Sequence, residues 1–126
     1  MITDYRIIKI THPVIDSVVF WDQRIWLNLK QLQLLFRVNK AKLERMISKL
    51  AQQMNLYSHY EAFSAVRIRK HDGKDFEYIY QVRYYDEQVI QALQKLNNCS
   101  EIDGFFLIMK QMETEARFEN SFQSSI

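Results

Sequence analysis

Short β-branched and aromatic runs near the start of the chain predict strands. Residues 5–10 (YRIIKI) and 15–21 (IDSVVFW) are two such runs, and Pro13 between them prevents one continuous strand. The second run continues through Asp22 and Gln23 into RIWL, which predicts a β-hairpin with a two-residue turn. This turn lacks the glycine that such turns prefer, so the register of the hairpin stays open.

The apolar positions change to helical spacing after residue 28. Asn28 is a capping residue type and precedes the first predicted helix, and Asn39 precedes the second after a turn at residues 37–39. The apolar stripe of the first helix consists of Leu29, Leu32, Leu35 and Phe36. The stripe of the second consists of Leu43, Met46, Ile47, Leu50 and Met54. Two helices joined by such a turn, the second with a basic outer face, are typical of a helix-turn-helix.

After a connection at residues 55–63, apolar and polar positions alternate as in a β-strand. The segments AVRIRK and DFEYIYQVRYY flank Asp72-Gly73, and this dipeptide is a strong signal for a two-residue hairpin turn. A β-hairpin directly behind a helix-turn-helix is interpreted as a wing. Arg67, Arg69, Tyr78 and Tyr80 are expected to alternate with Ile68 and Ile79 across its strands. The tyrosines are expected to pack across the strands.

The remainder of the chain predicts two more helices. Asp86 can cap a helix whose inner face carries Val89, Ile90, Leu93 and Leu96, and residues 97–100 break it. A last helix is expected from about Glu101 and contains FFLIM at 105–109, a run that is apolar all around the axis. Such a run is either core or interface. We predict a homodimer, with an interface formed by Phe105, Phe106, Ile108 and Met109.

These elements together predict an α+β fold, a winged helix-turn-helix with an N-terminal β-hairpin and C-terminal helices. Residues 1–118 are expected to form this single domain, and residues 119–126 a frayed tail. With 126 residues, 48% of them hydrophobic, the chain suits one core. No apolar run is long enough to span a bilayer, and Cys99 has no second cysteine to pair with. A soluble cytoplasmic protein is expected.

Charge is unevenly distributed, although the net charge is only +2. Residues 37–49 hold five basic side chains and one acidic, whereas residues 101–119 hold two basic and five acidic. Lys and Arg suit DNA phosphates and the acceptors of guanine, so the second helix and the wing are predicted to bind double-stranded DNA. The candidate DNA-binding residues are Lys40, Lys42, Arg45, Ser48, Lys49, Arg67, Arg69, Lys70 and Lys74. The alternative is a solvated helix face, and Asp72 and Asp75 reduce the charge of the wing.

The segment IWLNLKQLQLLFRVNKAKLERMISKL resembles the N-terminal domain of the RhuM family of bacterial and prophage proteins. The resemblance continues at 67–92, where a basic strand, Asp72-Gly73-Lys74 and a tyrosine-rich return strand lead to Tyr84-Tyr85-Asp86. It covers roughly residues 18–96 and implies a DNA-binding fold. At the corner between the two helices the family usually has glycine, whereas this chain has Arg37. Family members also commonly continue beyond this module.

Patterns for catalysis or metal binding are missing from the sequence. His12, His59 and His71 are far apart, without Cys or carboxylate at metal-ligand spacing, and there is no glycine-rich phosphate loop. We therefore expect a non-enzymatic protein with no cofactor and no metal. The main hypothesis is a bacterial or phage transcriptional regulator. The alternative is a small phage-type inhibitor or adaptor that binds another protein, which the modest charge and the acidic tail favour.

Overall fold

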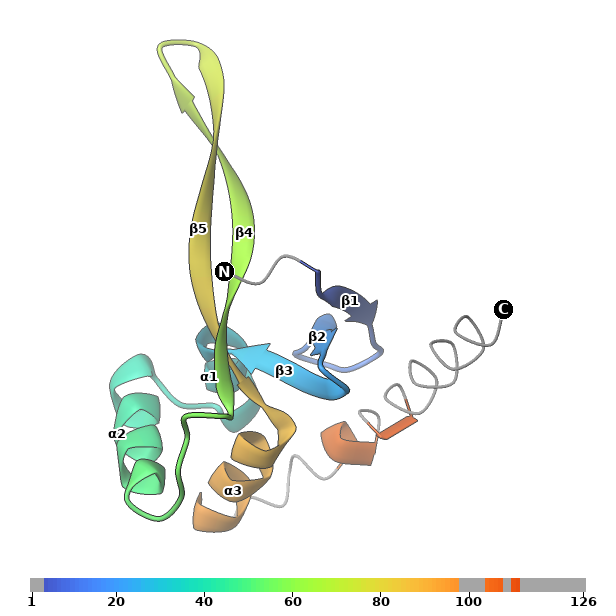
Figure 1. The fold of residues 1–126 in the computed structure, drawn as a ribbon, viewed down its shortest axis with the longest axis vertical. Helices are drawn as coiled ribbons and strands as arrows, with labels where there is room; N and C mark the ends of the chain where they lie inside the picture. The colour runs from blue at the N-terminus through green and yellow to red at the C-terminus, as the bar shows by residue number, and fades with distance from the viewer. Residues whose placement is uncertain (1–3, 98–103, 108–109, 112–126) are drawn as a thin grey trace.

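The computed structural model describes residues 4–97, 104–107 and 110–111 (Figure 1). Five strands form one antiparallel sheet in the order β1-β2-β3-β5-β4. The strands are β1 (Arg6–Lys9), β2 (Ser17–Trp21), β3 (Arg24–Asn28), β4 (Tyr60–His71) and β5 (Lys74–Asp86). The helices are α1 (Leu29–Phe36), α2 (Lys40–Ala51) and α3 (Glu87–Asn97). Residues 104–107 and 110–111 are also helical.

The predicted fold class is wrong, because the two hairpins are not separate units. β3 pairs with β5, so that Trp26 lies opposite Asp86 and Leu27 opposite Tyr85. The pairing joins the N-terminal strands and the expected wing into one curled five-stranded sheet, a half-barrel, in place of a winged helix-turn-helix. β5, with 13 residues, is longer than α1, α2 or α3. Local periodicity does not reveal this pairing, because its partners are far apart in the sequence.

Three predicted helix caps are confirmed. The side chain of Asn28 accepts from the backbone amide of Gln31 at 2.8 Å, and the Gln31 side chain accepts from the Asn28 amide at 3.0 Å. Asn39 accepts from the amide of Lys42 at 2.8 Å. Asp86 begins α3, since its Oδ1 accepts from the amides of residues 88 and 89. Each cap satisfies amides that the first helical turn leaves without a partner.

The sheet buries a different core on each face. The main core lies between the sheet and the helices, and it includes Ile25, Leu27 and Tyr85 from the strands. A smaller aromatic cluster lies on the other face, where Phe63 is 1% exposed. The rings around Phe63 are Tyr5, Trp21, Trp26 and Tyr84, with centroids 5.1–5.8 Å from it.

β4 and β5 extend beyond the sheet as a two-stranded arm (Figure 1). β3 pairs only with residues 84–86 of β5. Residues 62–71 of β4 and 74–83 of β5 therefore pair with each other and, among the described residues, with no third strand. Ten residues of strand rise about 33 Å. Asp72 and Gly73 form the tip with φ values of 53° and 75°, which confirms the predicted two-residue turn. We refer to residues 62–83 as the arm.

Candidate nucleic-acid interface

The register of the arm sorts its side chains onto two faces of opposite character. Side chains alternate along a strand, and directly opposite residues share a face, so Arg67 lies beside Tyr78 and Arg69 beside Phe76. We call this side the cation–aromatic face. It consists of Arg67, Arg69, His71, Lys74, Phe76, Tyr78 and Tyr80.

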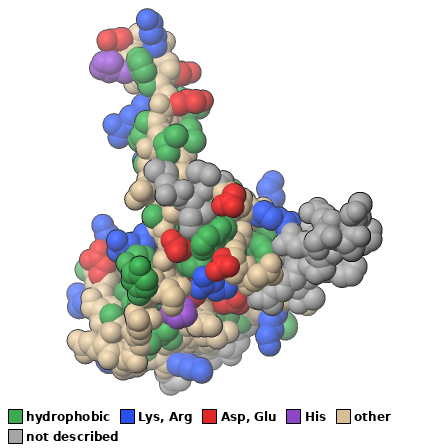
Figure 2. Space-filling view, viewed as in Figure 1, with side chains coloured by type: hydrophobic (Ala, Val, Ile, Leu, Met, Phe, Trp, Pro, Cys, Tyr) green, Lys and Arg blue, Asp and Glu red, His purple; other side chains and the backbone are tan. Residues whose placement is uncertain are grey.

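The opposite side of the arm carries the carboxylates and the exposed aliphatic residues. Val66 lies opposite Ile79, Ile68 opposite Glu77, and Lys70 opposite Asp75. Consequently the strands contribute no carboxylate to the cation–aromatic face between residues 63 and 82. The turn contributes one, because the carboxylate of Asp72 lies 3.5 Å from Nε2 of His71. In Figure 2 the basic and acidic side chains lie mainly on opposite sides of the arm below its tip, whereas both kinds are present at the tip. The net charge of the hairpin does not reveal this separation.

Arginine and tyrosine side chains on the cation–aromatic face are stacked on one another. The guanidinium of Arg67 lies 5.0 Å from the ring centroid of Tyr80, and that of Arg69 lies 5.3 Å from the ring of Tyr78. The two tyrosine rings are 5.9 Å apart. Hydrogen bonding with Tyr78, the largest cause, raises the pKa of Arg67. The tyrosines therefore pack across the strands as expected, and they also hold the two guanidinium groups in place.

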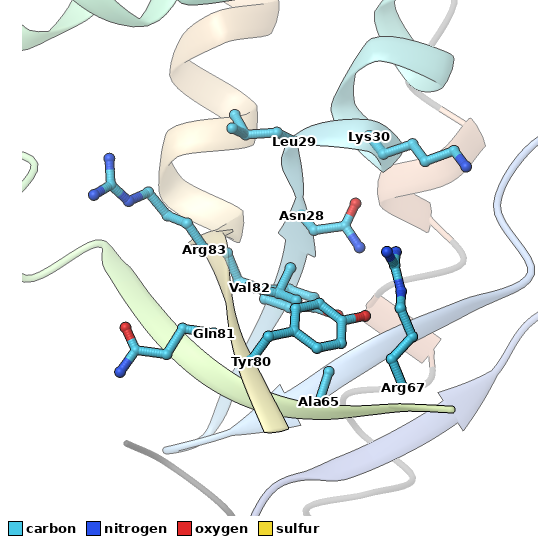
Figure 3. A pocket seen from close by; sticks show the side chains of 10 residues that line it. Asn28, Leu29, Lys30, Ala65, Arg67, Tyr80, Gln81, Val82 and Arg83 are labelled. Carbon is cyan, nitrogen blue, oxygen red and sulfur yellow. The ribbon is translucent and has the colours of Figure 1, made fainter. Parts of the chain in front are cut away.

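A pocket of about 460 Å³ lies where the base of the arm meets the junction of β3 and α1 (Figure 3). Arg67 and Tyr80 line it from the arm, and Asn28, Leu29 and Lys30 line it from the junction. Tyr84 also lines the pocket, and burial raises the pKa of its phenol.

The basic residues predicted on the second helix are exposed on α2. The apolar stripe faces the core through Leu43, Met46 and Leu50. Exposed on the outer side are Lys40, Lys42, Arg45, Ser48 and Lys49. Lys40 lies 4.0 Å from Glu44, whereas Lys42 and Arg45 form no ion pair with a described residue. α2 and the tip of the arm lie at opposite ends of the molecule, so the structure divides the predicted DNA-binding residues into two surfaces (Figure 1).

The four residues predicted for a dimer interface differ in their placement. Phe105 is fully buried in the main core of its own chain, where its ring meets His12 at 5.4 Å. Phe106 is partly buried against the same core. Ile108 and Met109 lie outside the described residues. Phe105 is therefore unavailable to a second copy, and the homodimer stays a prediction.

The interpretation of the sequence missed Lys30, whereas it did place Tyr78 and Tyr80 on the same face of the hairpin as the two arginines. The register of β4 and β5 confirms the alternation of Arg67, Arg69, Tyr78 and Tyr80 with Ile68 and Ile79. Lys30 carries no such signal, because its proximity to the arm depends on the long-range pairing of β3 with β5.

No three His, Cys, Asp or Glu side chains among the described residues lie close enough to hold a metal ion. None of the described helices has the length and apolar character needed to cross a membrane.

Comparisons with known proteins add no relative. No protein-family model, no curated protein and no solved structure matches the chain. The resemblance to the RhuM family therefore rests on the quoted sequence motifs alone.

Proposed function

We propose that the protein binds double-stranded DNA, with the cation–aromatic face of the arm lying along the duplex. The observation that carries this proposal is the separation of charge on the arm, which leaves Arg67, Arg69 and Lys74 on a side to which the strands add no carboxylate. Phosphate contacts from Lys and Arg supply most of the affinity of such complexes. Tyrosine stacking orders Arg67 and Arg69 before binding, which reduces the entropy lost when they meet phosphates.

The shape of the arm supports the same function. The major groove of B-DNA admits a two-stranded β-ribbon, and the arm has no third strand among the described residues that would widen it. The exposed cations of α2 provide a second contact at the other end of the molecule. On this proposal the protein is a DNA-binding regulator located in the cytoplasm.

Two adjacent arm residues offer a matched test. Arg69 and Lys70 are both exposed and carry the same charge, but they lie on opposite faces of the arm. We expect Arg69→Gln to weaken binding to a random 20-bp duplex at least threefold and to make the salt slope shallower by about one. Lys70→Gln should change the affinity less than twofold. Equal effects of the two substitutions would contradict the proposed face, and absence of salt-dependent binding by the unmodified protein would contradict the function.

A second candidate function is binding to another protein, in the manner of an inhibitor or adaptor. The observation that favours it is the aliphatic strip on the other face of the arm, where Val66, Ile68 and Ile79 are each more than 60% exposed. Contiguous exposed aliphatic residues are typical of interaction surfaces. If duplex DNA fails to bind, this strip is the surface to test by substitution of Ile68 and Ile79 to threonine.

A further inference from the structure

We propose that the pocket at the base of the arm holds one unpaired nucleotide of the bound DNA. This inference rests on the proposed function and adds a specific ligand class at one end of the cation–aromatic face. The pocket, at about 460 Å³, falls within the range of small-molecule sites, about 300–1,000 Å³.

The charged residues around the pocket select an anion. Lys30, Arg67 and Arg83 are among the ten lining residues, and none of the ten is acidic. In Figure 3 the Lys30 and Arg67 side chains extend along the same side of the pocket, while Arg83 points away from it. A phosphate group between Lys30 and Arg67 would receive charge-assisted hydrogen bonds from two separate elements. The guanidinium of Arg67 already lies over the ring of Tyr80, which fixes its position on the pocket wall.

The remaining walls suit a flat ring. Tyr80 presents an aromatic ring within the pocket, and Leu29 and Val82 add apolar surface from the helix and from the arm (Figure 3). Base–aromatic stacking tolerates any base, because each base has a π face. Asn28 and Tyr84 supply polar atoms next to this surface. An anionic group beside a stacking surface and an amide matches the chemistry of a nucleotide.

The ligand must be unpaired for a geometric reason. A base in a duplex is covered on both faces by its neighbours and is joined to its partner along one edge. It reaches a protein pocket only after it leaves the stack, and this costs least where the base has no partner. The pocket lies at the end of the arm that joins the sheet. An arm lying along the duplex therefore brings the pocket against the same DNA.

The test compares three duplexes of equal length by fluorescence anisotropy with the full chain. One duplex is fully paired, one carries a single unpaired thymidine, and one carries an abasic nucleotide at that position. We expect the unpaired thymidine to bind at least fivefold more tightly than either of the other two. Lys30→Ala and Tyr80→Ala should each reduce this preference to less than twofold. Ile79→Ala, which changes the residue next to Tyr80 on the opposite face, should leave the preference unchanged.

Each alternative result has a distinct meaning. Salt-dependent binding of all three duplexes with equal affinity would overturn the nucleotide site and leave the proposed function standing. An abasic nucleotide that binds as tightly as thymidine would overturn it too, because the base would then make no contact. Binding of free thymidine monophosphate as tight as that of the bulged duplex would make a free nucleotide the ligand. Failure of every duplex to bind would reject the proposed function together with this inference.

Discussion

The carboxylate of Asp86, which has no exposed surface, lies 2.9 Å from a guanidinium nitrogen of Arg24. The same oxygen, Oδ2, lies 2.8 Å from Nδ1 of His59, and the other oxygen caps α3. Arg24 also donates to the backbone carbonyl of Ser58 at 2.8 Å. One buried carboxylate thus connects β3, the loop before β4 and the start of α3.

Removing this carboxylate should be strongly destabilising. Asp86→Ala leaves Arg24 without its buried partner and α3 without its cap, so we expect a loss of about 3 kcal/mol in the free energy of unfolding. Urea denaturation followed by circular dichroism measures it. Asp22→Asn is the matched control, since Asp22 lies 2.7 Å from the same guanidinium but is 59% exposed, and asparagine tolerates its φ of 52°, so the substitution should cost less than about 1 kcal/mol. Similar losses from the two substitutions would contradict the importance given to burial.

The two glycines of the chain should respond to alanine with opposite signs. Gly73 has a φ of +75° and Gly104 lies in a helix, and a Cβ at either position would meet no atom within 4 Å. The two substitutions should therefore differ only through the backbone conformation that each position requires. We expect Gly73→Ala to destabilise the tip of the arm by about 1 kcal/mol and Gly104→Ala to stabilise the protein by up to about 1 kcal/mol. Thermal unfolding measures the second effect, and hydrogen exchange of the arm amides measures the first. The same sign for both would reject this explanation.

The outer face of α2 provides a prediction about DNA affinity. Lys42 and Arg45 are exposed and form no ion pair with a described residue, so the double substitution Lys42→Ala and Arg45→Ala should weaken duplex binding at least tenfold. A control with the same change of net charge replaces Lys9 and Lys95, which are exposed on other elements. Gel-shift titrations at constant salt compare the two proteins. If both lose affinity equally, overall charge and not the face of α2 determines binding.

His12 makes folding stability depend on pH in a defined direction. Its Nδ1 accepts from the backbone amides of Val14 at 3.2 Å and Ile15 at 3.3 Å, and burial lowers the pKa of His12 below its ordinary value of 6.5. The unfolded chain therefore takes up a proton at a higher pH than the folded chain. The free energy of unfolding should fall as the pH drops below about 6.5 and should level off below the folded-state pKa.

Urea denaturation at pH 7.5, 6.5 and 5.5 tests this dependence. His12→Asn keeps an acceptor near the same two amides but does not titrate, so its stability should fall less over that interval. Both proteins retain His59 and His71, so the difference between their pH profiles reports the contribution of His12 alone. Identical pH profiles would show that His12 does not contribute.

Local features of the sequence predict local features of the structure. Asn28, Asn39 and Asp86 each cap an amide two or three residues away, and such a contact depends on little besides the nearby sequence. The Asp72-Gly73 turn belongs to the same class. Arg37 adopts a φ of 56° at the corner between α1 and α2. This left-handed backbone conformation favours glycine, and an arginine adopts it at a higher cost in free energy.

The arrangement of the sheet could not be predicted in this way. The pairing of β3 with β5 depends on which of several possible strand pairs buries the most apolar surface, and hydrophobic periodicity does not rank them. The same pairing places Arg24 next to Asp86 and Lys30 next to the arm. The apolar run at 105–109 was similarly ambiguous, since Phe105 is buried whereas Leu107 is 63% exposed.

The arm has a consequence for how this protein can change during evolution. Every residue from Val66 to Glu77 is exposed, and none contributes to either buried core. Away from the turn at Asp72 and Gly73, substitutions at such positions usually change stability by no more than about 0.5 kcal/mol. Selection can therefore alter the two faces of the arm independently of each other and of folding. A chain of this kind can acquire a new binding preference through successive single substitutions while each intermediate remains folded.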